Sequence, residues 1–241
     1  MYKPIIVVPF YNHFTAFSKF AKKLLKLSYP ILVVNDGSIP EETNKVKKLC
    51  KEHNFYYVEL PKNQGKGGAV IAGIQYAIKN NYSHILQIDA DGQHEYKDID
   101  KFIESSKNNP SNIINGAPVY DNSAPKVRLY GRKITKFCVW IETLGANISD
   151  TMCGFRVYPI EKMKTILPIL YFKRMGFDTE IMVKSYLNGI DIINLSTKVK
   201  YPKNGVSHFN CFKDNIEISM MHTTLCFYAM YKLIFKWRKN V

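Results

Sequence analysis

Two carboxylates separated by one residue follow an apolar run in Ile85-Leu86-Gln87-Ile88-Asp89-Ala90-Asp91-Gly92-Gln93-His94. The run predicts a buried strand that brings Asp89 and Asp91 to the carboxyl edge of a sheet, and Gly92 permits the turn that follows. Ligands of open α/β sheets bind at that edge. Carboxylates held this close repel each other and favour a bound cation, for which Mg²⁺ or Mn²⁺ suits hard oxygen ligands. In isolation such a pair is more often a solvated turn, so its neighbours decide its meaning.

The composition limits the class of protein. A chain of 241 residues with 46% hydrophobic residues predicts one large domain with a sizeable core. Its formal charge of +14 favours an anionic partner, which can be nucleic acid, an anionic membrane face or a phosphorylated substrate. The five cysteines form no C-x-x-C pair, so they indicate reduced thiols rather than a zinc ribbon or a disulfide framework. A strand follows the first residues at once, which predicts no signal peptide and a cytoplasmic protein.

Short apolar runs alternate with helical patterns through the first half of the chain. This alternation predicts an α/β fold with a mostly parallel central sheet flanked by helices. Strands are expected at residues 5–8, 31–34, 56–60, 85–88 and 113–115, with the first strand ending at Pro9. The less regular second half is expected to hold a helix at 128–147, a strand at 155–158, a helix at 179–187, a strand at 190–199 and a loop at 202–208.

Three further segments are expected to open on the same edge as the acidic pair. They are Pro9-Phe10-Tyr11-Asn12, Asp36-Gly37-Ser38 and Gln64-Gly65-Lys66-Gly67-Gly68. Asp36 is placed to accept hydrogen bonds from the edge of a base, and Tyr11 to pack on a ring. The amides of the glycine-rich segment and Lys66 are placed to meet phosphate at a helix N-terminus.

Taken in order, these segments resemble the inverting family 2 glycosyltransferases of the GT-A fold. The matching pieces are Val7-Val8-Pro9-Phe10-Tyr11-Asn12, Val33-Val34-Asn35-Asp36-Gly37-Ser38, Asn63-Gln64-Gly65-Lys66-Gly67-Gly68-Ala69 and Asp89-Ala90-Asp91-Gly92-Gln93-His94. Two later pieces, Asp150-Thr151-Met152-Cys153-Gly154-Phe155-Arg156 and Phe177-Asp178-Thr179-Glu180, are most similar to polyprenyl-phosphate sugar transferases related to dolichol-phosphate mannosyltransferase. The resemblance implies a Rossmann-like GT-A domain that uses a nucleotide sugar, with UDP or GDP as the nucleotide.

The resemblance also implies roles for individual residues. Nucleotide contacts are expected from Pro9, Tyr11, Asn12, Asp36, Lys66, Asp89 and Ala90. A divalent ion, Mg²⁺ or Mn²⁺, is expected on Asp89, Asp91 and Gln93, and donor or acceptor phosphates on Arg132 and Arg156. His208 either closes on the diphosphate from its loop or remains a solvated loop histidine. His13 stands where some relatives carry an acidic residue, which leaves the ribose contact and the donor open.

The acceptor decides which residues the chemistry needs. Asp91 with its metal, assisted by Arg156, is expected to stabilise the leaving nucleoside diphosphate. A lipid phosphate is already an anionic nucleophile and needs no strong base. A hydroxyl of a glycan or an envelope lipid needs a carboxylate to take its proton, and Asp178 or Glu180 is the candidate. The alternative for these two residues is that they are acids favoured by a helix N-terminus.

Basic and aromatic residues come together twice in the second half. Basic residues at 126–136 precede apolar ones at 137–144, and the apolar stretch 218–231 precedes a basic end, so both segments are either membrane-surface helices or ordinary packed helices. We expect a glycosyltransferase domain at 1–210, divided into a nucleotide-sugar half at 1–116 and an acceptor half at 117–210, followed by a basic amphipathic helical segment at 211–241. The protein is then peripheral on the inner face of a membrane. A nucleic-acid-binding module is the rival class, but the positive charges are dispersed and no nucleic-acid-binding signature is visible.

Overall fold

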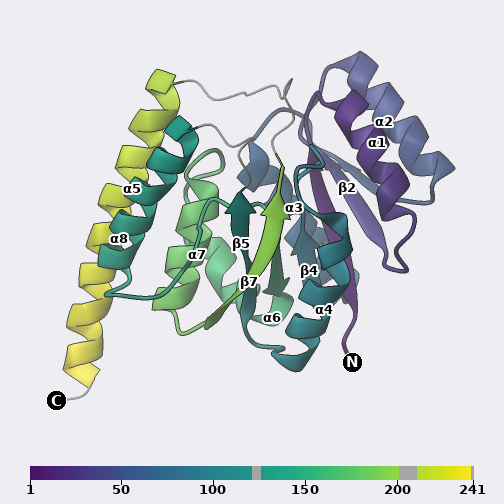
Figure 1. The fold of residues 1–241 in the computed structure, drawn as a ribbon. Helices are drawn as coiled ribbons and strands as arrows, with labels where there is room; N and C mark the ends of the chain where they lie inside the picture. The colour runs from purple at the N-terminus through teal and green to yellow at the C-terminus, as the bar shows by residue number, and fades with distance from the viewer. Residues whose placement is uncertain (121–125, 201–210, 240–241) are drawn as a thin grey trace.

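The computed structural model describes residues 1–120, 126–200 and 211–239. The described strands form a seven-stranded sheet in the order β3-β2-β1-β4-β6-β5-β7, in which β6 runs antiparallel to its neighbours β4 and β5 (Figure 1). The strands are β1 (Pro4–Phe10), β2 (Ile31–Asn35), β3 (Tyr56–Glu59), β4 (His84–Gln87), β5 (Ile113–Tyr120), β6 (Arg156–Pro159) and β7 (Ile192–Val199). The predicted mostly parallel α/β sheet is confirmed.

Helices cover both faces of this sheet. The helices are α1 (Phe14–Leu24), α2 (Pro40–Glu52), α3 (Lys66–Lys79), α4 (Ile99–Asn108), α5 (Lys126–Glu142), α6 (Ile160–Ile166), α7 (Phe177–Leu187) and α8 (Cys211–Lys239). One core cluster joins α1, α2 and α4 to the sheet, and a second joins α3, α6 and α7, with contributions from α5 and α8. Because both faces are covered, Ile5 to Val8 of β1 are all fully buried, as expected for a central strand of a parallel sheet.

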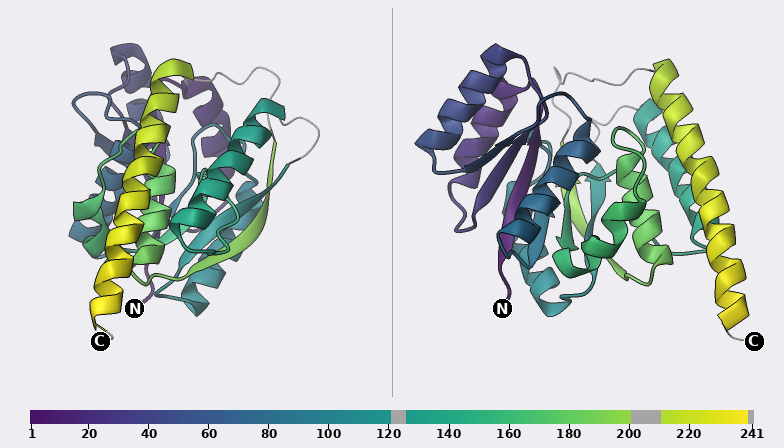
Figure 2. Two further views of the ribbon diagram at one scale, coloured as in Figure 1. Left: turned by 90° about the vertical axis from the view of Figure 1, so that its left-hand side faces the viewer. Right: turned by 180° about the vertical axis from the view of Figure 1, so that it is seen from behind.

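The helices α5 and α8 lie side by side at the end of the molecule that is farthest from α1 and α2 (Figure 2). The 29-residue helix α8 provides the C-terminal helical extension that the sequence predicts. It buries Met221, Leu225 and Ala229. None of the helices in the described parts of the chain combines the length and the apolar character needed to cross a bilayer.

The ends of β1 and α5 differ from the prediction. β1 continues past Pro9 to Phe10, because pairing with β4 ends at Val7 and the missing N–H of Pro9 is tolerated where β2 is the one neighbour. α5 ends at Glu142 rather than at residue 147, since Leu144 adopts a φ of 57° and the Gly145 N–H donates to the Trp140 carbonyl at 2.8 Å. The sequence interpretation also missed α4 and α6, and the predicted loop at 202–208 lies outside the described residues.

Candidate functional site

Hydrogen bonds connect the segments that follow β1 and β2 at one edge of the sheet. Asn12, two residues beyond the end of β1, accepts a hydrogen bond from the Ile39 N–H at 3.0 Å through its side chain. Its own N–H donates to the Ser38 hydroxyl at 3.0 Å. Tyr11 is half-buried beside it, and Pro9 lies within β1. The predicted nucleotide-binding segments of the first two strands therefore lie together.

Asp36, which follows β2, organises the segment that leads into α3. Its carboxylate accepts hydrogen bonds from the backbone N–H groups of Gln64 at 2.7 Å and Gly65 at 2.8 Å, and from the Asn63 side chain at 3.0 Å. Burial raises the pKa of Asp36, and these hydrogen bonds oppose that rise. Arg174 extends the network by donating to the Asn63 side-chain oxygen at 2.8 Å. Contact between Asp36 and a base stays a prediction.

The glycine-rich segment packs against protein rather than forming an open phosphate cradle. The Gly67 N–H donates to the Lys173 carbonyl at 2.8 Å, and the Gly68 N–H lies 3.4 Å from the same oxygen. A Cβ on Gly67 would lie 2.4 Å from the ring of Phe177, so this close approach requires glycine. The expectation that the amides of Gly67 and Gly68 bind phosphate is wrong, because the segment ending in Phe177 already occupies that helix N-terminus.

Lys66 connects two of the predicted acidic residues. Its ammonium lies 2.7 Å from an oxygen of Asp178 and 3.1 Å from an oxygen of Asp89. Burial lowers the pKa of Lys66, but the two carboxylates outweigh it and hold the pKa above its usual value. The structure thus brings Asp89, a predicted metal ligand, and Asp178, a predicted base, into contact with one cation.

Arg156 is a buried connector. Its side chain is fully buried at the start of β6. The guanidinium donates to the Asn115 side chain at 3.0 Å, to the Thr151 carbonyl at 2.5 Å and to the Asp178 backbone carbonyl at 2.9 Å. It also lies 3.3 Å from the Asp178 carboxylate. This burial corrects the expectation that Arg156 faces a phosphate, because all these partners are protein atoms and the side chain has no exposed surface.

Asp89 is confined by Gly154, which precedes β6, and by His94 from the turn that follows β4. A Cβ on Gly154 would lie 2.0 Å from one oxygen of Asp89, so this position must be glycine. His94 approaches the same carboxylate, with 3.9 Å between Nε2 and the oxygen. Burial lowers the pKa of His94 to about 4, which keeps the ring neutral at physiological pH. Sequence reasoning missed the role of Gly154, since its contact with Asp89 follows from the position of β6 beside β4.

Asp91 lies exposed on the same edge. Its carboxylate accepts the Gln93 N–H at 2.9 Å, and Ala90 between the two acids is buried in the core. Among the residues that the structure describes, no three His, Cys, Asp or Glu side chains gather around one point as a metal cage. The hard oxygens of Asp89 and Asp91 nevertheless fit an ion whose remaining ligands come from a diphosphate. The metal therefore stays a proposal.

Arg132 of α5 contacts the segment that precedes β6. Its guanidinium pairs with the Asp150 carboxylate and lies 5.4 Å from the centre of the Tyr120 ring. Asp150 also accepts the Met152 N–H at 2.7 Å. Asp150 is a partner that the sequence interpretation did not assign, although it opens the motif that ends in Arg156. The predicted phosphate contact of Arg132 is untested, and His208 lies outside the described residues.

Glu180 is fully buried. Its carboxylate accepts the N–H groups of Tyr171 at 3.0 Å and Phe172 at 2.9 Å, and it lies 2.5 Å from the ammonium of Lys184. This environment corrects the expectation that Glu180 is a candidate base, because a carboxylate without exposed surface cannot reach an acceptor. Of the two predicted candidates for the base, Asp178 is the one that lies at the edge of the sheet, beside Lys66.

Comparison with known families and relatives gives a consistent result. The sequence matches the family model described as glycosyl transferase family 2 over residues 5–167. It is 29% identical over 210 residues to a dolichyl-phosphate beta-glucosyltransferase of Dictyostelium discoideum, a match that covers 83% of this chain and 63% of the relative. It is 27% identical to an uncharacterised protein of Methanocaldococcus jannaschii, over 87% of this chain and 93% of that protein.

Solved structures with the same fold are more distant in sequence. Glucosyl-3-phosphoglycerate synthase from Mycobacterium tuberculosis in complex with UDP has a TM-score of 0.67 at 13% identity, covering 93% of this chain and 80% of that one. Residues 1–349 of S. aureus TarS in complex with UDP-GlcNAc have a TM-score of 0.63 at 16% identity, covering 92% and 66%. At these identities the likeness establishes the fold.

Proposed function

Since the chain belongs to glycosyl transferase family 2, we propose that it moves a sugar from a nucleotide-sugar donor to the phosphate of a polyprenyl phosphate, with inversion at the sugar carbon. The chain is a glycosyltransferase with the GT-A fold. The observation that carries the proposal is the cation of Lys66 between Asp89 and Asp178 at the edge of the sheet. Lys66 joins Asp89 of the proposed donor-side motif to Asp178, whose segment resembles polyprenyl-phosphate sugar transferases.

The donor side of the site follows from the first four strand ends. Asp36 and Tyr11 are placed for the nucleoside, and UDP or GDP is the proposed carrier. Asp89 and Asp91, with Gln93, would hold Mg²⁺ or Mn²⁺, which would supply positive charge to the departing diphosphate. Lys66 holds Asp89 in position, and Gly154 leaves the space that this carboxylate needs.

The acceptor side favours a nucleophile that needs no strong base. Asp178 is held between Lys66 at 2.7 Å and Arg156 at 3.3 Å, so each of its two carboxylate oxygens already contacts a cation of the protein. A lipid phosphate is already anionic, so it suits this setting. We assign to Arg156 the positioning of Asp178 and of the Thr151 carbonyl. The second candidate is transfer to a glycan or envelope-lipid hydroxyl, for which Asp178 would be the base.

Relatives named dolichyl-phosphate beta-glucosyltransferase support the lipid acceptor. This chain spans 63% of the length of the Dictyostelium protein, so the shared segment supports the transfer reaction rather than every property of that relative. We also propose that the protein works at the inner face of a membrane, where a long polyprenyl chain is held.

Binding of one nucleoside diphosphate is the expected result of a thermal-shift screen of UDP, GDP, CDP and dTDP with Mn²⁺. A diphosphate at 100 times its dissociation constant stabilises the folded state by about 2.7 kcal/mol. For a chain of this size that corresponds to a rise in melting temperature of about 5–10 °C. The rise should shrink when EDTA replaces Mn²⁺. If none of the four diphosphates raises the melting temperature above that of the unliganded protein, the nucleotide-sugar proposal is wrong.

A further inference from the structure

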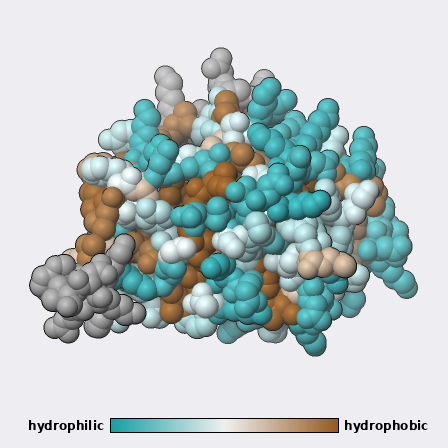
Figure 3. All heavy atoms as spheres, turned by 90° about the horizontal axis from the view of Figure 1, so that it is seen from below, coloured by the Kyte–Doolittle hydropathy of each residue, from teal (hydrophilic) through white to brown (hydrophobic). Residues whose placement is uncertain are grey.

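Large exposed hydrophobic side chains are concentrated on two neighbouring helices. Of the 23 such side chains in the described structure, 13 belong to α5 and α8. This α5–α8 face consists of Tyr130, Ile134, Phe137, Trp140, Ile141, Phe212, Ile216, Met220, Phe227, Met230, Tyr231, Leu233 and Ile234. In Figure 3 hydrophobic residues are visible on the side of the molecule where these helices lie, and others lie over the middle of the view. An apolar surface of this extent marks an interaction site rather than scattered exposure.

Among the described side chains of the same two helices, the exposed charges are all positive. Exposed cations lie on α5 at Lys133 and Lys136, and on α8 at Lys213. The sequence of the two helices holds three carboxylates, Glu142, Asp214 and Glu217. Glu142 and Asp214 are buried, and the half-buried Glu217 accepts the Gly176 N–H at 3.1 Å. A surface of apolar side chains and exposed lysines complements an anionic lipid surface.

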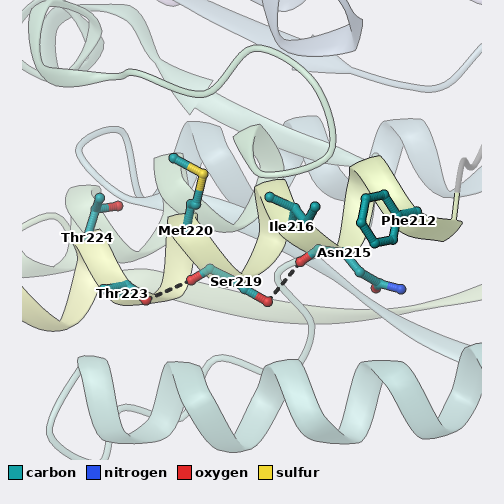
Figure 4. A pocket seen from close by; sticks show the side chains of 7 residues that line it. All are labelled: Phe212, Asn215, Ile216, Ser219, Met220, Thr223 and Thr224. Atoms are coloured by element: carbon teal, nitrogen blue, oxygen red, sulfur yellow. Dashed lines mark hydrogen bonds between the residues drawn. The ribbon is translucent and has the colours of Figure 1, made fainter.

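Polar groups within the apolar stripe of α8 are already bonded inside the helix. The hydroxyls of Ser219 and Thr223 donate to the carbonyls of Asn215 at 2.8 Å and Ser219 at 2.9 Å (Figure 4). The Thr224 hydroxyl donates to the Met221 carbonyl at 2.8 Å. These hydroxyls already have hydrogen-bond partners in the helix. Moving the stripe out of water therefore costs less desolvation free energy than it would for unbonded hydroxyls. The stripe, which includes Phe212, Ile216 and Met220, borders a groove of about 750 Å³.

The α5–α8 face also adjoins the edge that carries the site. A second groove of about 430 Å³ runs between the first turns of α8 and the glycine-rich segment, and its lining includes Gln64, Arg174, Lys213 and Ile216. Arg174 is bonded to Asn63, which in turn contacts Asp36. A lipid headgroup at this end of the face would therefore lie beside the nucleotide side of the site.

We propose that the α5–α8 face docks on an anionic lipid bilayer, with Phe137, Trp140 and Phe227 entering the interface and Lys133, Lys136 and Lys213 meeting the headgroups. A second copy of the chain is a poorer occupant, since a twofold contact of this face with itself would set these lysines against one another without exposed acids. Docking by this face would orient the site toward a lipid acceptor. The purpose of docking rests on the proposed function, but the docking itself does not. Membrane binding is measured without donor or acceptor.

The test is cosedimentation of the full chain with vesicles of phosphatidylcholine and phosphatidylglycerol in equal amounts, beside vesicles of phosphatidylcholine alone. We expect binding to the anionic vesicles that weakens as salt is added. The double variant Phe137→Glu/Phe227→Glu should bind at least about tenfold more weakly, because binding scales with buried apolar area. Phe137 and Phe227 are 62% and 67% exposed, so the variant should retain the fold. Circular dichroism checks this.

Ile39→Glu is the matched control, since Ile39 is 53% exposed but lies at the start of α2, away from the α5–α8 face. It should bind vesicles like the unaltered protein. Three results would overturn the proposal: no binding of the unaltered chain to anionic vesicles, equal loss in the control, or a dimer in solution that the double variant dissociates. Retained nucleotide binding in the same preparations would separate failure of this proposal from failure of the proposed function.

Discussion

Replacing Asp91 by alanine is expected to lower sugar transfer by at least about 10³-fold while leaving the fold intact. Asp91 is exposed at the edge of the sheet, and its carboxylate accepts the Gln93 N–H of its own turn. Loss of that hydrogen bond should cost no more than about 1 kcal/mol of folding free energy. Initial rates of transfer and thermal unfolding of the same preparation measure the two effects separately.

Asp91→Asn separates charge from turn geometry. The asparagine side chain keeps an oxygen that accepts the Gln93 N–H but removes the negative charge that a divalent ion needs. We expect this variant to lose transfer as Asp91→Ala does. Full activity of Asp91→Asn together with an inactive Asp91→Ala would mean that Asp91 only shapes the turn, and the metal proposal would then fail.

Glu180→Gln is expected to destabilise the fold by about 3 kcal/mol, which corresponds to a fall in melting temperature of about 6–12 °C. The substitution retains an acceptor for the amides of Tyr171 and Phe172 but removes the anion beside Lys184, whose side chain is 2% exposed. A buried ammonium without an anionic partner carries a large desolvation cost. Chemical denaturation of the variant measures the change in the free energy of unfolding.

Glu161→Gln provides the comparison for this prediction. Glu161 pairs with Lys164 at 2.6 Å, but its side chain is 84% exposed, so the same chemical change should cost less than about 1 kcal/mol. If Glu180→Gln folds as stably as Glu161→Gln but loses transfer, Glu180 has a chemical role that its burial does not suggest.

The sequence predicts the architecture well because its signals are local. Buried strands of a parallel sheet are continuous apolar runs, as in β1 and β4, and the residues that follow them fall at one edge. The ordered motifs add the family, which the match over residues 5–167 supports. The missed helix α4 also had a signal, because Ile99, Phe102 and Ile103 have helical spacing.

Contacts between distant segments were beyond such reasoning. Arg156 and Glu180 lie in motifs, but whether a charged side chain faces a ligand or the interior depends on its neighbours. Arg156 meets Asn115 from β5 and Asp178 from α7, and Glu180 meets the backbone of Tyr171 and Phe172. The Lys173 carbonyl that occupies the start of α3 has no sequence signal, since any residue supplies a carbonyl. These roles follow from tertiary packing.

The most direct test of the proposed reaction supplies the purified protein with Mn²⁺, a polyprenyl phosphate in detergent and a panel of radiolabelled UDP- and GDP-sugars. The account predicts a labelled lipid product with one donor, absent with Asp91→Asn and cleaved by mild acid as expected for a glycosyl phosphate. Absence of labelled lipid with every donor, together with transfer to a glycan hydroxyl, would contradict it.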